Sequence, residues 1–183
     1  MIPGISPLRE TYGWEAIADR AKAERDFLLA QQANAAAKME DRESKIEKGD
    51  FHPQSSTFDP RPSPGVFYLA IGNRSYPCPS QLAFHLNDPE NVHGTSLIGI
   101  RNLQYQFWSE PEKLRGQDAV VVLESGTGNP WTLLILAKHF QSVEPAGETV
   151  LTIGKLPFGP KRQRRFFFYR ARGYRGLQEE ANP

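Results

Sequence analysis

The chain has 183 residues, and its 39% share of hydrophobic residues with 15 glycines and 15 prolines predicts one core and one poorly packed stretch. Its 22 basic and 21 acidic residues give a net charge of +1, so the overall charge indicates neither a nucleic-acid nor a membrane partner. The single cysteine, Cys78, excludes an intramolecular disulfide and a thiolate cluster for zinc or iron–sulfur binding.

The N-terminal residues, MIPGISPLRE, have no basic region followed by an apolar stretch, so they do not read as a secretory signal. The longest apolar runs, at residues 119–123 and 133–137, are far shorter than the roughly 20 residues that cross a bilayer. The sequence therefore predicts no membrane span.

The segment at residues 11–48 is rich in Ala, Glu, Lys, Gln and Arg and contains no proline, which predicts a helix. Its first half carries an apolar stripe at three-to-four spacing, formed by Trp14, Ile17, Ala18, Ala21 and Leu28. After Leu29 the only sizeable apolar residues are Met39 and Ile46. Within an N-terminal unit at residues 1–48, we expect the first half of the helix to pack on a core and the second half to project.

Residues 49–65 form the clearest break in the chain. Four prolines interrupt backbone hydrogen bonding there, namely Pro53, Pro60, Pro62 and Pro64. This composition favours an extended linker. We therefore expect an α/β domain at residues 66–176 and a flexible tail at residues 177–183.

The strands of this domain are predicted first by their apolar runs. Residues 66–71 (VFYLAI) and 119–123 (AVVVL) are apolar on both faces, as the central strands of a parallel sheet are. Residues 96–100 (SLIGI) predict a further strand between them in the chain. Additional strands are expected at residues 143–145, 149–156 and 165–169.

Two short helices separate these strands. Residues 80–86 (SQLAFHL) predict a helix with Ser80 as its N-cap, and residues 131–140 predict another. Because strands alternate with helices, the sequence favours an α/β fold in which a mostly parallel sheet carries flanking helices in three layers.

The loop at residues 101–108 (RNLQYQFW) follows a predicted strand, at the edge where open α/β sheets bind ligands. Aromatic faces beside amide and guanidinium donors suit a sugar or a sugar phosphate. The candidate ligand-binding residues of this loop are Arg101, Gln104, Tyr105 and Trp108. In the alternative reading, Tyr105, Phe107 and Trp108 fill the sheet edge and the polar groups cap the loop.

Two other stretches have a composition suited to anions. The SGTGNP turn at residues 125–130 precedes a helix and either cradles a phosphate or forms an ordinary glycine-rich turn. Residues 161–175 interleave basic and aromatic side chains, a composition suited to nucleic-acid backbones or lipid head groups. The aromatics there also fit a core strand with arginines at its ends, and Arg170 and Arg172 join the candidate ligand-binding set.

The remaining polar residues predict no catalytic chemistry. The histidines are scattered without a metal-ligand spacing, so His52, His85, His93 and His139 are expected at the surface or in packing. Ser80 and Ser125 lack the context of a nucleophile elbow. We expect no metal site, no cofactor and no catalytic residue in this chain.

Six segments occur in the order found in one known family. They are LRETYGWEAIADRA (8–21), SQLAFHLNDPENVHG (80–94), LQYQFW (103–108), RGQDAVVVLE (115–124), FQSVEP (140–145) and RRFFFYRARGYRG (164–176). Together they resemble the C-terminal extracytoplasmic domain of bacterial polyprenyl-phosphate-sugar glycosyltransferases, akin to protein O-mannosyltransferases and the lipid A aminoarabinose transferase. The chain departs from the family at Leu103, where asparagine is usual, and at Gln106, where aspartate is usual, so an acidic group is missing from that loop.

The resemblance implies a Rossmann-like or flavodoxin-like sheet on the periplasmic face of the inner membrane. The family's catalytic residues lie between transmembrane helices that have no counterpart here, so none can be assigned to this chain. The leading hypothesis is a noncatalytic accessory domain derived from a membrane glycosyltransferase, with a protein partner and a place in a larger, membrane-associated assembly. The alternatives are a module that binds a sugar phosphate or a polyprenyl phosphate, and an RNA- or ribosome-associated protein that binds through its basic C-terminal segment.

Overall fold

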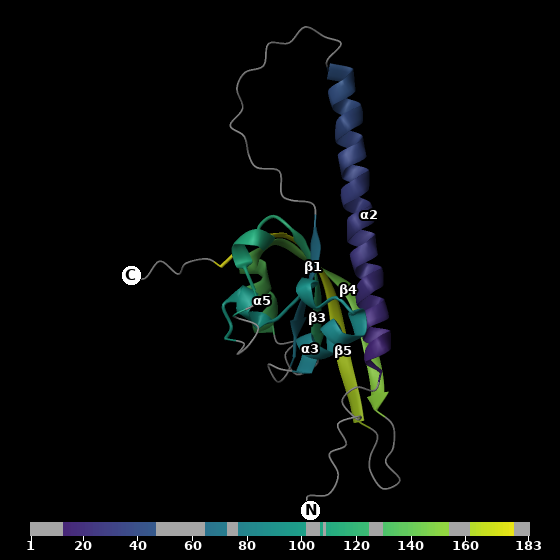
Figure 1. Cartoon of the computed structure of the whole chain (residues 1–183), viewed down its shortest axis with the longest axis vertical. Coiled ribbons are helices and arrows are strands. Elements are labelled where there is room, and N and C mark those ends of the chain that lie inside the picture. Colours follow the sequence, from purple (N-terminus) through teal and green to yellow (C-terminus); the bar gives the residue numbers. More distant parts are fainter. Residues whose placement is uncertain are drawn as a thin grey trace, which may run out of the picture.

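The computed structural model describes residues 13–46, 65–72, 77–101, 107, 109–124, 130–153 and 162–177. Within them the chain forms a mixed α/β fold around a five-stranded sheet with the strand order β2-β1-β3-β5-β4. Figure 1 shows the long helix α2 on one side of the sheet and the short helix α5 on the other. The predicted linker lies outside the described residues, except for Gly65.

The N-terminal helix α2 spans Trp14–Ile46. Its apolar stripe is buried against the sheet, and Trp14 meets Phe166 edge-on with 5.1 Å between ring centres. Beyond this contact region, every residue from 33 to 39 is exposed. Figure 1 shows this part of α2 extending past the end of the sheet. The helix persists there because its Ala-rich sequence has high intrinsic helix propensity.

The central strands are parallel. Strand β1 (Val66–Ile71) pairs in parallel with β3 (Asp118–Glu124) along its whole length and with the two-residue strand β2 (Val92–His93). All six residues of β1 are buried, as expected for a strand covered on both faces. The strands predicted at residues 66–71 and 119–123 are therefore neighbours in one sheet.

The strand predicted at residues 96–100 is wrong. Thr95–Ile98 forms the 3₁₀ helix η2, which ends at Gly99 with φ +74°. Successive strand residues point to opposite faces, yet the adjacent Leu97 and Ile98 both enter the same core. A 3₁₀ turn permits this, and β2, just before it, provides the edge strand instead.

The C-terminal part of the sheet is antiparallel. Strands β4 (Phe140–Ile153) and β5 (Arg162–Tyr174) pair with each other, and β5 also pairs with β3. The strands expected at residues 143–145 and 149–156 are parts of the one strand β4, except that residues 154–156 lie outside the described residues, and the strand expected at residues 165–169 lies within β5. The prediction of a mostly parallel sheet holds for β2, β1 and β3 alone.

The short helices begin close to where they were expected. Helix α3 spans Pro77–Leu86, so Ser80 lies inside it and is not its N-cap. Proline suits the first turn of a helix because its missing N–H would have no partner there. Helix α5 spans Pro130–His139, and two further 3₁₀ turns, η1 (Pro89–Asn91) and η3 (Pro111–Leu114), lie between the main elements.

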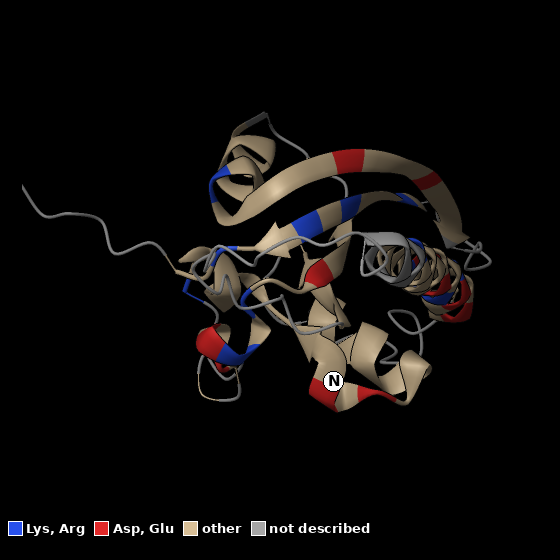
Figure 2. Cartoon of the chain, turned by 90° about the horizontal axis from the view of Figure 1, so that it is seen from above, with Lys and Arg blue, Asp and Glu red and all other residues tan. Residues whose placement is uncertain are grey.

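The sheet separates two cores, which gives three layers. Helices α2 and α3 cover the first core, which includes Trp14, Tyr68, Cys78, Leu82, Val120, Phe166 and Phe168. Helix α5 and η2 cover the second core, which includes Phe67, Leu69, Leu97, Val121, Leu136, Phe140 and Tyr174. Seen from above in Figure 2, α5 and α2 lie on opposite sides of β5.

The end of β5 turns at Gly173, whose φ of +59° favours glycine. Ala171 and Tyr174 both enter the second core, although strict alternation would place them on opposite faces. A side chain at position 173 would also collide with that of Gln141. This turn brings the Tyr174 hydroxyl to the carbonyl oxygen of Leu97, to which it donates over 2.5 Å.

Candidate functional site

Arg170 and Arg172, two of the predicted ligand-binding residues, lie on the face of β5 that α2 covers. Nε and Nη2 of Arg170 each lie 2.7 Å from Oε2 of Glu24. Glu24 is only 4% exposed, and its second carboxylate oxygen lies 2.6 Å from Nη2 of Arg20. The Arg170 guanidinium also lies 3.9 Å from the ring centre of Phe27. These contacts fix α2 on the sheet.

Arg172 belongs to a second polar group under the same helix. It donates to the side-chain oxygen of Gln31, and its Nη1 lies 3.9 Å from Oδ2 of Asp118. The same oxygen of Asp118 accepts a hydrogen bond from Gln32 over 2.9 Å, and Oδ1 accepts one from the Gly173 N–H over 3.0 Å. The carboxylate of Asp118 thus joins α2, β3 and β5, and Arg172 points at partners within the chain.

The remaining predicted ligand-binding residues lie elsewhere. Arg101 is exposed and follows η2, which packs in the second core on the opposite face of the sheet from Arg170. Gln104, Tyr105 and Trp108 lie outside the described residues. Because residues 95–98 form a 3₁₀ helix, the loop after them does not follow the carboxyl end of a strand, which was the reason for expecting a ligand there.

The parallel strands create another candidate position. β1 and β3 are neighbours, and the helices that follow them, α3 and α5, cover opposite faces of the sheet. In open α/β sheets, ligands bind outside the carboxyl ends of the strands at such a switch point. Of the predicted phosphate turn, residues 125–129 lie outside the described residues.

Two described side chains mark this edge. Glu124, at the end of β3, accepts a hydrogen bond from Nε of Arg164 over 2.8 Å, and both side chains are largely buried. Burial, reinforced by the Glu124 carboxylate, raises the pKa of the nearby Cys78 thiol. The thiol therefore stays protonated and has little nucleophilic character. We refer to Gly72, Cys78, Glu124 and Arg164 as the β1–β3 edge.

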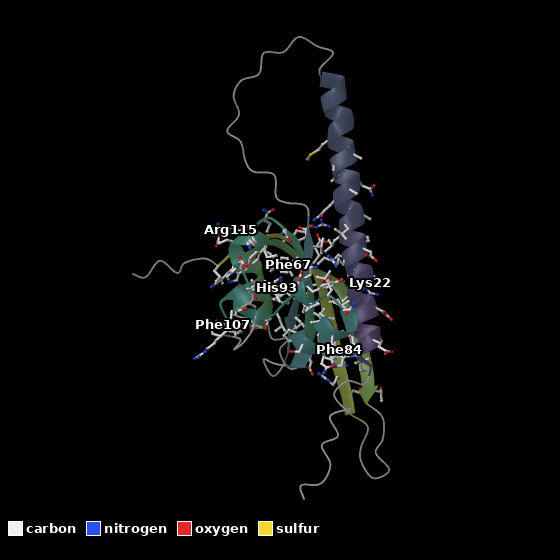
Figure 3. All side chains as sticks on the ribbon, viewed as in Figure 1. Lys22, Phe67, Phe84, His93, Phe107 and Arg115 are labelled. Atoms are coloured by element: carbon white, nitrogen blue, oxygen red, sulfur yellow. The ribbon has the colours of Figure 1, made fainter. Side chains whose placement is uncertain are left out.

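His93 is a packing residue on β2. Its ring meets Phe67 nearly at a right angle, with 5.5 Å between ring centres, and Figure 3 labels both residues near the middle of the molecule. Nδ1 of His93 lies 3.4 Å from Oγ of Ser109, which in turn lies 3.4 Å from Oγ of Ser96. Burial lowers the pKa of His93 from its ordinary value of 6.5 to about 4. The imidazole is therefore neutral near pH 7.

The sequence analysis missed the outward surface of α5. Trp131 is 58% exposed and Leu134 is 64% exposed, and Leu133 beside them is partly exposed. Thr132, Leu136 and His139 are the helix residues that turn inward and are buried. The signal was present in the sequence PWTLLILAKH, which is apolar almost all round and so has more apolar side chains than one buried face needs.

Among the described residues, no group of three or more His, Cys, Asp or Glu side chains is arranged to hold a metal ion. No described helix combines the length and the hydropathy that a membrane span requires. Comparisons of the chain with protein-family models, with curated proteins and with solved structures find no match. The functional argument therefore starts from the chain's own residues.

We predict that Glu24→Ala lowers the free energy of unfolding by about 3 kcal/mol, because it leaves the Arg170 guanidinium without its buried partner. Replacing both residues by leucine should recover most of this loss, since no uncompensated buried charge then remains; Arg20, the other partner of Glu24, is 45% exposed. Urea denaturation of the single and double variants measures the effect. Glu148→Ala is the control: its pair with Arg165 is half exposed and 3.9 Å long, so it should change stability by less than about 1 kcal/mol. Equal losses for Glu24→Ala and Glu148→Ala would contradict the role given to Glu24.

We also predict a stability loss in mild acid that depends on His93. The folded protein resists protonation of His93 down to about pH 4, whereas the unfolded chain takes up this proton near pH 6.5. The contribution is therefore complete above pH 6.5 and is lost as the pH falls toward 4, by about 3 kcal/mol in total. Urea denaturation at a series of pH values across this range gives the free energy of unfolding. That free energy should fall less with decreasing pH for His93→Gln than for the unaltered protein. If the free energy of unfolding falls equally with pH in the two proteins, another group causes the loss.

Proposed function

We propose that this chain is a noncatalytic interaction domain, derived from a membrane glycosyltransferase and acting as a subunit of a larger assembly. The observation that carries the proposal is the exposed stretch of α2 at residues 33–39. From residue 33 to residue 39 every side chain of the helix is exposed, and Figure 1 shows this part of α2 beyond the end of the sheet. An isolated helical segment is marginally stable in water, so a partner that packs on it would stabilise it. The six collinear segments support the glycosyltransferase origin.

The arginines of β5 have partners within the chain, which supports a protein partner for this chain over RNA. Arg164 and Arg170 pair with Glu124 and Glu24, and Arg172 is held by Gln31 and Asp118. Figure 2 shows where the basic residues lie along β5, and the contacts of Arg170 and Arg172 are made with residues of α2 and with Asp118. Binding to a phosphate backbone would require these arginines to leave their partners within the chain. Arg170 and Arg172 are thus better explained as residues that hold α2 on the sheet.

We also propose the type of sheet that the resemblance to the glycosyltransferase domain implies. The parallel strands β2, β1 and β3, with helices on both faces, are compatible with a Rossmann-like or flavodoxin-like sheet. The antiparallel pair β4 and β5 is an addition to such a sheet. That pair carries the contacts to α2, so we propose that it adapts the domain for displaying the helix.

We predict that the chain, tagged in its native source and extracted in mild detergent, elutes in a complex with a membrane protein that has glycosyltransferase activity. Ala36→Asp, within the exposed stretch of α2 at residues 33–39, should lower capture of this partner by about fivefold, because a charge enters the contact surface. Ala23→Asp is the matched control, since Ala23 is exposed on the half of the helix that packs on the sheet. A chain that always elutes free and monomeric would rule out the assembly, and equal capture of the two variants would rule out this part of α2 as the contact.

A second candidate function is the binding of a sugar phosphate or a polyprenyl phosphate. The observation that favours it is the switch point at the β1–β3 edge, where α3 and α5 start. Backbone N–H groups at helix starts favour anions, and Arg164 adds a positive charge. Arg164 is, however, already paired with Glu124, so we rank this function second.

Titration with nucleotide sugars and short polyprenyl phosphates, followed by amide chemical shifts, tests the second candidate. We predict saturable shifts at Gly72, Glu124 and Trp131, the described residues that border the edge and the start of α5. Shifts centred instead on Arg101 would support the loop at residues 101–108 as the site. The absence of any shift at millimolar ligand would eliminate this function.

A further inference from the structure

The outward face of α5 carries apolar side chains where a surface helix usually carries polar ones. Trp131, Leu134 and Lys138 lie at positions i, i+3 and i+7, so they form one stripe along the helix. The two apolar members are more than half exposed. A surface helix of a soluble domain ordinarily places charged and polar residues on such a stripe. We call Trp131, Leu133, Leu134 and Lys138 the α5 face.

The charge on α5 itself has one sign. The helix contains no acidic residue, and Figure 2 shows a single blue band and no red one on it. Its last turn carries Lys138, and the backbone N–H of Arg175 donates to the carbonyl oxygen of His139 over 2.8 Å, which places a second cation at the same end. In the part of the chain that the structure describes, neither Lys138 nor Arg175 has an acidic partner.

We propose that the α5 face docks on a membrane surface rich in anionic lipids. Tryptophan and leucine side chains enter the boundary between head groups and acyl chains, while a lysine beside them extends its ammonium to the phosphates. The unpaired cations select anionic head groups by charge complementarity. A protein groove would need to neutralise both cations, whereas an anionic bilayer does so without a specific arrangement of carboxylates. The inference rests on the proposed function, since it names the surface against which the assembly forms.

The geometry of the fold makes this docking compatible with a protein partner. The α5 face lies over the second core, and α2 covers the first core on the other side of the sheet. Contact with a bilayer through α5 therefore leaves the exposed stretch of α2 at residues 33–39 accessible to a protein partner. The inward side of α5 is anchored by the buried Leu136 and His139, whose Nδ1 lies 3.0 Å from the carbonyl oxygen of Gly176.

Flotation of the full chain with vesicles of equal parts phosphatidylglycerol and phosphatidylcholine tests the proposal. We expect binding to these vesicles and at least about fivefold weaker binding to phosphatidylcholine alone. Trp131→Ala and Leu134→Ala should each weaken binding about tenfold, because each removes apolar surface from the lipid boundary. Lys138→Ala should weaken it about fivefold, and added salt should remove that difference.

Phe84→Ala is the matched control, because Phe84 is 76% exposed but lies on α3, on the other side of the sheet. Its binding should equal that of the unaltered chain, and the thermal transitions of all variants should coincide. No flotation, or equal flotation of Trp131→Ala and Phe84→Ala, would overturn the proposal. A dimer in solution that Leu134→Ala converts to a monomer would also overturn it, because a second copy would then cover the face.

The test separates this inference from the proposed function because partner capture is measured in detergent, without a bilayer. Capture without flotation would overturn the lipid surface and leave the assembly supported. Flotation that depends on Trp131, in the absence of any captured partner, would support the α5 face and contradict the assembly.

Discussion

The buried carboxylate of Glu24 determines how the rest of the molecule is arranged. It lies in the middle of the part of α2 that packs on the sheet, and Arg170 approaches it from β5. A buried charge is tolerated only when it is paired and hydrogen-bonded, so this contact admits one position of the helix along the strand. Burial of the apolar stripe of α2 stabilises the packing of the helix on the sheet, and the contact of Glu24 fixes the position of the helix along β5. With the helix in this position, its exposed stretch at residues 33–39 lies beyond the end of the sheet (Figure 1).

The two faces of the sheet are therefore used differently. On the first face the polar contacts are made within the chain, through Glu24, Asp118 and the arginines of β5. On the second face η2 and α5 pack through apolar contacts, and α5 has apolar residues left over that point outward. Both proposals follow from this asymmetry. One side displays a helix and the other displays an apolar surface with positive charge at its end.

Much of the fold was predictable because its signals are local. The 3.6-residue stripe from Trp14 to Leu28 predicts both α2 and its buried side, and the continuous apolar runs of VFYLAI and AVVVL predict adjacent central strands. SLIGI was misassigned because a short apolar run does not reveal whether adjacent side chains face one core or two. The length of β4 and β5 was underestimated because Pro145, Ala146 and Gly147 interrupt the apolar pattern of β4, where its pairing with β5 is irregular, and because β5 begins with the polar residues RQRR.

The candidate sites were less predictable, because their chemistry depends on pairs distant in the chain. Arg170 and Arg172 were predicted from the sequence to bind a ligand. Nothing in the neighbouring sequence indicates that Glu24 and Gln31 are their partners. The burial of His93 likewise depends on Phe67 from a different strand. The exposed stripe of α5 could have been inferred from its composition, whereas which of its apolar residues point outward follows only from the packing of Leu136 and His139.

The pairing of α2 with β5 also orders events during synthesis. The two partners of the Glu24–Arg170 contact are separated by 146 positions, and α2 leaves the ribosome long before β5 exists. Until then its apolar stripe has only part of the sheet to cover, and contacts between such distant segments form slowly. The growing chain must therefore pass through a stage in which Trp14 and Leu28 are open to other hydrophobic surfaces. A partner or a chaperone that occupies this stripe early would be displaced when the last strand completes the sheet.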